Sequence, residues 1–143
     1  MNSKINFFKI PIIICSAIFL MSCGMQGVGI KKGEEWLASK TDNPGMDVSG
    51  NWSSPEWGEA IFRQEGNSIT GTLGDYPVKG VVSGNGLYLM MMYSGELIHY
   101  FAELKAIDKN SFSGFYSKYQ IIDEVRNNPS FTRPMKLTRD KIQ

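Results

Sequence analysis

Short runs of alternating apolar and polar residues fill the chain from Val48 onward, separated by Gly-Asn and similar pairs about every ten residues. This pattern is typical of antiparallel strands joined by tight hairpin turns. Two-residue turns favour Gly and Asn because their central residues need a positive φ. A turn at Gly66-Asn67 predicts one mostly apolar face, on which Gln64 pairs with Ile69, Phe62 with Gly71 and Ala60 with Leu73.

The next turns keep the apolar residues on the same face. We expect a four-residue loop at Gly74 to Pro77 and two-residue turns at Gly84-Asn85 and Gly95-Glu96. A slip of one residue at any turn would send the apolar set to the opposite face. The expected pairs are Leu73 with Val78, Val82 with Leu87, Gly80 with Leu89, Val78 with Met91, Met91 with Tyr100, Leu89 with Ala102, and Leu87 with Leu104.

The end of the chain continues this meander after an interruption. A three-residue loop at Asp108 to Asn110 extends the apolar face to Phe112, while Tyr119 to Arg126 is either a helical turn or a surface loop. A last strand near Phe131 to Arg139 and a first strand at Val48 to Ser53 bring the count to about eight. The sequence therefore predicts an all-β fold, an antiparallel up-and-down meander that forms a small closed or nearly closed barrel, because closure removes exposed edges.

One outward face departs from the expected polarity. Tyr88, Met90 and Met92 face outward opposite Glu103, Phe101 and His99, where alternation should place polar residues. Thioether and imidazole groups together suit Cu(I), but methionine is also a common filler of apolar surface. We interpret this apolar strip as a contact surface for a partner. The alternative is that the segment 118–129 or the residues before the barrel cover it.

The first residues have the pattern of an export signal. Lys4 and Lys9 precede an apolar run from Ile10 to Met21, which is too short to span a bilayer as a helix. Leu20-Met21-Ser22-Cys23 follows directly and resembles the lipobox of bacterial lipoproteins. The resemblance implies removal of residues 1–22 as a signal peptide and attachment of lipid to Cys23, which two or three acyl chains make stable.

The resemblance also implies an address in the cell envelope. Residues 23–47 mix Gly, Lys, Glu and Asn, and we expect a lipidated tether there, with a turn or two of helix around Trp36, followed by the barrel domain at residues 48–143. Gly24 follows the cysteine where an Asp would resemble an inner-membrane retention signal. The expected location is therefore the outer membrane, facing the periplasm, if the host has two membranes.

Charge and cysteine content exclude several classes of function. Cys15 leaves with the signal peptide and Cys23 takes lipid, so the mature domain has no thiol for a disulfide, a zinc site or catalysis. Loss of Lys4 and Lys9 leaves 13 basic against 14 acidic residues. This balance argues against nucleic-acid binding. We expect no metal and no cofactor.

A second resemblance concerns the barrel itself. Gly50-Asn51-Trp52 in the opening strand and Arg139 in the last strand, together with the meander, look like the calycin pattern of lipocalins and avidins. The resemblance implies that Trp52 closes the base of the barrel beneath Arg139 in a cation–π contact. The strands are short, however, and neither a biotin-site motif nor a second lipocalin signature is present.

No pattern in the chain indicates catalysis. His99 is the only histidine, and its expected neighbours include no nucleophile or orienting acid. Trp57 follows the first strand, where it either contacts a ligand at the barrel mouth or packs as a lid. We therefore expect a non-enzymatic envelope protein whose barrel binds a small apolar ligand or an envelope protein. The alternatives are an accessory subunit of a membrane assembly, and an enzyme or an inhibitor of a cell-wall enzyme.

Overall fold

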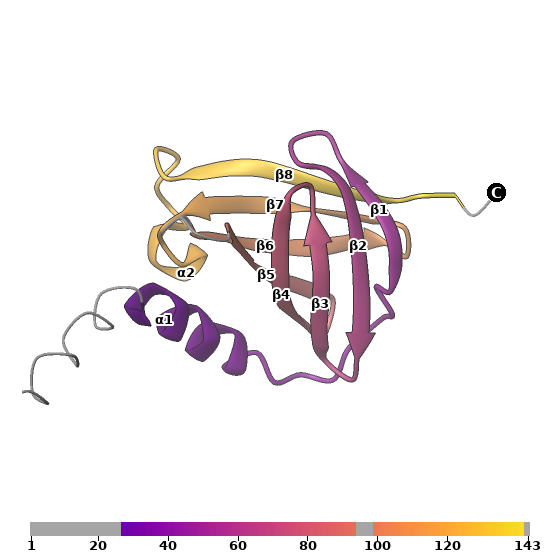
Figure 1. The fold of residues 1–143 in the computed structure, drawn as a ribbon, viewed down its shortest axis with the longest axis horizontal. Helices are drawn as coiled ribbons and strands as arrows, with labels where there is room; N and C mark the ends of the chain where they lie inside the picture. Colours follow the sequence, from indigo (N-terminus) through magenta and orange to yellow (C-terminus); the bar gives the residue numbers. More distant parts are fainter. Residues whose placement is uncertain (1–26, 94–98, 142–143) are drawn as a thin grey trace, which may run out of the picture.

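The protein is a closed barrel of eight antiparallel strands in sequence order, with two helices of the described residues packed against the outside of its wall (Figure 1). The computed structural model describes residues 27–93 and 99–141. Two helices are present in this part of the chain, α1 (Gly27–Ala38) and the single turn α2 (Ile122–Val125). The strands are β1 (Gly50–Ser54), β2 (Gly58–Glu65), β3 (Ser68–Leu73), β4 (Tyr76–Ser83), β5 (Gly86–Met92), β6 (His99–Asp108), β7 (Ser111–Lys118) and β8 (Thr132–Arg139).

Most of the predicted strand pairing is confirmed. The pairs expected across β2–β3, β4–β5 and β5–β6 all occur, including Phe62 with Gly71, Val82 with Leu87 and Leu89 with Ala102. The up-and-down order and the closure of the barrel between β1 and β8 are also as expected. The predicted turn at Gly95-Glu96 lies outside the described residues.

Two predicted connections are wrong in length. Gly74 adopts φ +55, which allows a two-residue turn, so Leu73 pairs with Tyr76 instead of Val78 and Pro77 lies inside β4. The shift is two residues, and the apolar face is therefore preserved. Between β6 and β7, Asp108 pairs with Ser111, so the connection is a two-residue turn and not the predicted three-residue loop. The extra residue lies in an irregularity of β6 between Ala106 and Asp108.

Large apolar side chains fill the inside of the barrel. Inward residues from all eight strands form one core cluster in which no side chain is more than 3% exposed. An eight-stranded barrel is just wide enough for its side chains to fill it. Gly114 has a packing role in this wall, since a Cβ there would lie 2.0 Å from the carbonyl oxygen of Glu103. The inward glycine therefore permits close approach of β6 and β7.

Trp52 closes one end of the barrel, called here the base. Its side chain is fully buried, and its Nε1 donates a hydrogen bond of 2.8 Å to the Val48 carbonyl. The Arg139 guanidinium lies 4.4 Å from the ring centroid of Trp52 and donates to the carbonyls of Ser49 and Asp47. The predicted contact between Trp52 and Arg139 is confirmed.

Helix α1 covers the apolar strip on the outer wall. Met90 and Phe101 form a second core cluster with Trp36, Leu37, Ile121 and Ile122, and Met90 is 0% exposed. Gly33 allows this close packing, because a Cβ there would lie 2.4 Å from the Met90 sulfur. The interpretation of the strip as an exposed contact surface is therefore wrong, and the alternative, that the residues before the barrel and the segment 118–129 cover it, is confirmed. The turn or two of helix expected around Trp36 is confirmed, and it belongs to a helix of 12 residues. Neither of the two described helices is long and apolar enough to cross a bilayer.

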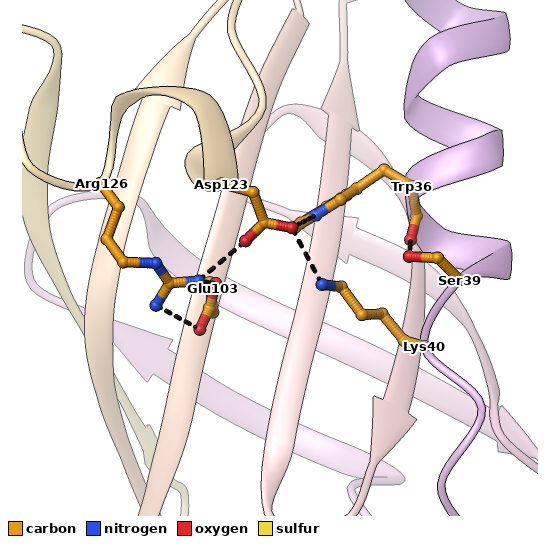
Figure 2. A network of polar contacts seen from close by, with 6 residues as sticks. All are labelled: Trp36, Ser39, Lys40, Glu103, Asp123 and Arg126. Carbon is orange, nitrogen blue, oxygen red and sulfur yellow. Dashed lines mark hydrogen bonds and ion pairs between the residues drawn. The ribbon is translucent and has the colours of Figure 1, made fainter.

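A polar network joins α1 to α2 above this second core (Figure 2). Asp123 accepts hydrogen bonds from Trp36 Nε1 and Lys40 Nζ, both at 3.0 Å, and from Arg126 at 2.8 Å. Arg126 also binds the buried Glu103 through two hydrogen bonds, of 2.9 and 2.6 Å. A bidentate pair of this kind satisfies a carboxylate that would be costly to bury alone. The network fixes α1 and α2 to each other and to β6.

The stability of this network should depend on acid pH. Partial burial alone would raise the pKa of Asp123, but the hydrogen bonds from Lys40, Arg126 and Trp36 outweigh it and hold the pKa below its usual value. Such a carboxyl stabilises the fold above its unfolded pKa of about 3.9, and the contribution is lost as the pH falls through the folded pKa.

Asp123→Asn should therefore flatten the fall in stability at acid pH. Because Asp123 is partly exposed, we expect a cost at neutral pH of about 1 kcal/mol or less. Urea unfolding followed by circular dichroism between about pH 6 and pH 3, spanning the carboxyl range, measures both effects. Equal acid slopes in the variant and the parent protein would contradict this role of Asp123.

Candidate functional site at the mouth of the barrel

The end of the barrel opposite Trp52 and Arg139, called here the mouth, is built from four connections. Because successive strands run antiparallel, the links β1–β2, β3–β4, β5–β6 and β7–β8 all lie at the same end. Three tight turns and the residues that flank β1 and β8 occupy the base. The mouth therefore combines side chains from segments that lie far apart in the sequence.

Aromatic rings gather at this mouth around Trp57. The Trp57 ring packs edge-on against Tyr76, Tyr100 and Tyr116, with ring centroids 5.2, 4.9 and 5.0 Å apart. Tyr93 extends the group through its contact with Tyr76 at 5.5 Å. Edge-to-face pairs of this kind are favourable beyond the area that they bury. The cluster closes the filled interior and presents aromatic surface at the end of the barrel.

A hollow of about 290 Å³ lies beside this aromatic cluster and carries positive charge on its rim. It is open to solvent, and its lining includes Tyr100, Tyr116, Lys118, Phe131 and Arg133. Nζ of Lys118 lies 5.9 Å from the Tyr100 ring centroid. Aromatic surface beside cationic groups suits a ligand with an apolar part and an acidic group.

A second hollow, of about 300 Å³, lies on the outer wall beside α2. It contains Glu103 and Arg126, which already pair with each other in the network described above. The mouth is the better candidate, because within the described residues neither Lys118 nor Arg133 forms an ion pair with a carboxylate.

Trp57 lies at the mouth, where the sequence placed it, and it serves as a partial lid on the core. Its Nε1 is buried and finds no hydrogen-bond acceptor among the described residues. A buried donor without a partner is unfavourable by about 1–3 kcal/mol. A ligand with an acceptor atom within reach of this Nε1 would relieve that cost.

The tyrosines of the mouth were not predicted as site residues. Tyr100 and Tyr116 did lie on the predicted inward face, and each lies in the part of its strand near the mouth. A tyrosine on the inward face near the end of a strand could have indicated such a site, because its hydroxyl group needs a polar partner or solvent. Tyr76 lay within the loop that was predicted too long.

The other candidate contact residues lie under α1, on the outer wall. Tyr88 and Met92 are partly buried, and burial raises the pKa of the Tyr88 hydroxyl, with a further contribution from the nearby Glu103 charge. His99 lies beside Gly29 of α1, and its Nδ1 is buried without a hydrogen-bond partner in the described structure. These residues do not contribute to the mouth. Cys23 lies outside the described residues.

No group of three His, Cys, Asp or Glu side chains that could hold a metal ion occurs within residues 27–93 and 99–141. His99 packs against α1 and is not joined to a hydroxyl nucleophile by any hydrogen bond in this part of the chain. The side chains at the mouth offer a ligand aromatic stacking, hydrogen bonding and positive charge.

Fold and site define a small up-and-down barrel with a filled interior, an aromatic mouth and an external helix. Family models, curated proteins and solved structures were all compared with the chain, and none of them matches it.

Proposed function

We propose that this chain is a lipid-anchored protein of the bacterial cell envelope, without catalytic activity, whose barrel mouth binds a ligand through aromatic and anionic contacts. The observation that carries the proposal is the open hollow in which Tyr100 and Tyr116 lie beside Lys118 and Arg133. The apolar strip that suggested a docking subunit is occupied by α1. The mouth therefore takes the place of the strip as the proposed binding surface.

Binding of an aromatic anion tests the mouth directly. The probe 1-anilino-8-naphthalene sulfonate combines flat apolar rings with a sulfonate, and its fluorescence rises in apolar surroundings. We expect it to bind the natively folded domain, and Tyr116→Ala to weaken that binding several-fold, because the variant removes a ring from the wall of the hollow. Fluorescence titration gives the dissociation constants, and circular dichroism checks the fold.

Phe115→Ala is the matched control, because Phe115 precedes Tyr116 in β7 but faces outward and is 53% exposed. The control should bind the probe as the parent protein does. Equal affinity for all three proteins would place the probe elsewhere and contradict the proposed binding role of the mouth.

Anchoring depends on Cys23, which the lipobox resemblance assigns as the attachment point. Cys23→Ala should release the protein from membranes or stall its processing, since no other thiol remains after the signal peptide is removed. Labelling of cells with radioactive palmitate measures the modification. Equal incorporation in the variant and the parent chain would show that the anchor is elsewhere.

A further inference from the structure

Exposed aromatic side chains and two cations share one side of the mouth. Tyr119 and Phe131 are 55% and 49% exposed, and they lie next to Lys118 and Arg133. We call these four residues the mouth face. Tyrosine and other amphipathic rings, mixed with Lys and Arg, are the residues that proteins place at the interface between membrane and water. The composition of the mouth face therefore fits a lipid headgroup layer.

The two cations of the mouth face are available to an anionic partner. Nζ of Lys118 lies 5.0 Å from the ring centroid of Tyr119. Arg133 donates to the carbonyls of Pro129 and Thr132, which hold its guanidinium at the rim. Neither side chain pairs with a carboxylate in the part of the chain that the structure describes. Their charge is complementary to an anionic surface.

The chain enters the fold at the same end. The first turn of α1 lies at the mouth, since a Cβ on Gly29 would meet His99, whose carbonyl accepts a hydrogen bond from the Tyr119 amide. Figure 1 shows α1 beginning on the left, where α2 and the start of β8 lie, while β8 ends on the right. Cys23 precedes the first residue of α1 by four positions. Four residues span at most about 14 Å.

We propose that the mouth face rests on the anionic phospholipid surface to which Cys23 anchors the chain, so that lipid phosphates are the ligands of Lys118 and Arg133. The proposal rests on the proposed function, because it identifies the ligand of the same site. A lipid at Cys23 would hold the start of α1, and with it the mouth, against the bilayer. The filled core leaves no space for an acyl chain inside the barrel, and contact is therefore confined to the headgroup layer.

Charge around the rim predicts a tilted orientation. Asp75 belongs to the link β3–β4, across the mouth from Lys118 and Arg133 in the β7–β8 half. An anionic surface repels Asp75 and attracts the two cations. The barrel should therefore lean on its β7–β8 side, where Tyr119 and Phe131 reach the headgroups.

Vesicle binding of residues 24–143 without lipid tests the surface apart from the anchor. This form keeps the whole barrel and both helices. We expect it to bind vesicles that contain phosphatidylglycerol more tightly than vesicles of phosphatidylcholine alone, and to lose affinity as salt rises. Each cation near an anionic surface contributes roughly fivefold, so Lys118→Gln with Arg133→Gln should weaken binding about 25-fold.

Tyr119→Gly separates binding from folding. Tyr119 has φ +66, a conformation that is strained for a bulky residue and relaxed for glycine. The variant should therefore fold at least as stably as the parent protein and still bind phosphatidylglycerol vesicles several-fold more weakly. Phe115→Ala, which removes an exposed ring from the wall of the barrel, should leave vesicle binding unchanged.

The lipidated chain allows the orientation itself to be measured. Its mature domain has no thiol other than the lipidated Cys23, so a single new cysteine can carry an environment-sensitive nitrobenzoxadiazole label. At Phe131→Cys the label should report the headgroup layer of the vesicle, and at Ile61→Cys, on the outer face of β2, it should report water.

Several results would overturn the lipid assignment. Equal vesicle binding by the parent protein and by the variants at Lys118, Arg133 and Tyr119 would move the contact away from the mouth face. Competition by soluble glycerol phosphate that abolishes vesicle binding would indicate a site for a free phosphate. Binding of the aromatic anion at the mouth without binding to either vesicle would leave the proposed function in place and refute the membrane contact alone.

Discussion

Trp52→Ala is expected to lower the free energy of unfolding by about 3–5 kcal/mol, the usual cost of removing a large buried aromatic side chain. Trp52 is fully buried, packs against Phe112 with ring centroids 5.4 Å apart, and supports the Arg139 guanidinium. The variant leaves a cavity at the base and removes the hydrogen bond to the Val48 carbonyl. Urea unfolding of residues 24–143, followed by circular dichroism, measures the change.

The control for Trp52 is Ile61→Ala in β2, where the side chain is 58% exposed. A substitution at such a position typically changes stability by no more than about 0.5 kcal/mol. A loss below about 1 kcal/mol for Trp52→Ala, the range of surface substitutions, would mean that the base does not anchor the barrel. It would also remove the main support for the calycin resemblance.

The second large effect is expected from Met90→Lys combined with Phe101→Lys. Both side chains lie in the core between α1 and the barrel wall, with exposures of 0% and 2%. Each new ammonium group must lie in apolar surroundings or displace the helix that covers it. We expect a loss of more than about 4 kcal/mol, a magnitude that marks unpaired charges in a core.

Displacement of α1 and global unfolding are distinguishable in this double variant. Limited proteolysis would cut near α1 while leaving the barrel intact if only the helix detaches. The control pair is Ile61→Lys with Phe115→Lys, because both residues are outward and more than half exposed. A Met90 and Phe101 variant as stable as this control would show that the strip faces solvent after all.

Much of the barrel follows from the sequence, because its determinants are local. Gly66 and Gly84 adopt φ +61 and φ +56, which their turns require. Those turns set the register, and the period of two then places the apolar residues inside. Gly74 also has a positive φ, but we predicted a four-residue loop at Gly74 to Pro77, which is two residues longer than the observed turn.

The sequence predicted only part of the helix that covers the apolar strip. Trp36 and Leu37 indicated a turn or two of helix, yet a helix of 12 residues is marginal in water by itself. Its stability comes from packing on Met90 and Phe101 and from the bonds to Asp123. Both contacts join residues more than 50 positions apart, which no local pattern encodes.

The sequence by itself determined the strand order, most of the register and the inward face, while the calycin resemblance implied the contact of Trp52 with Arg139 at the base. Only the tertiary structure decided that α1 covers the strip and that Trp57, Tyr76, Tyr100 and Tyr116 meet at the mouth. The physical reason is how far apart in the sequence the interacting residues lie. Turn chemistry and alternation act between near neighbours, whereas the mouth and the helix contact form only when the closed barrel brings distant segments together.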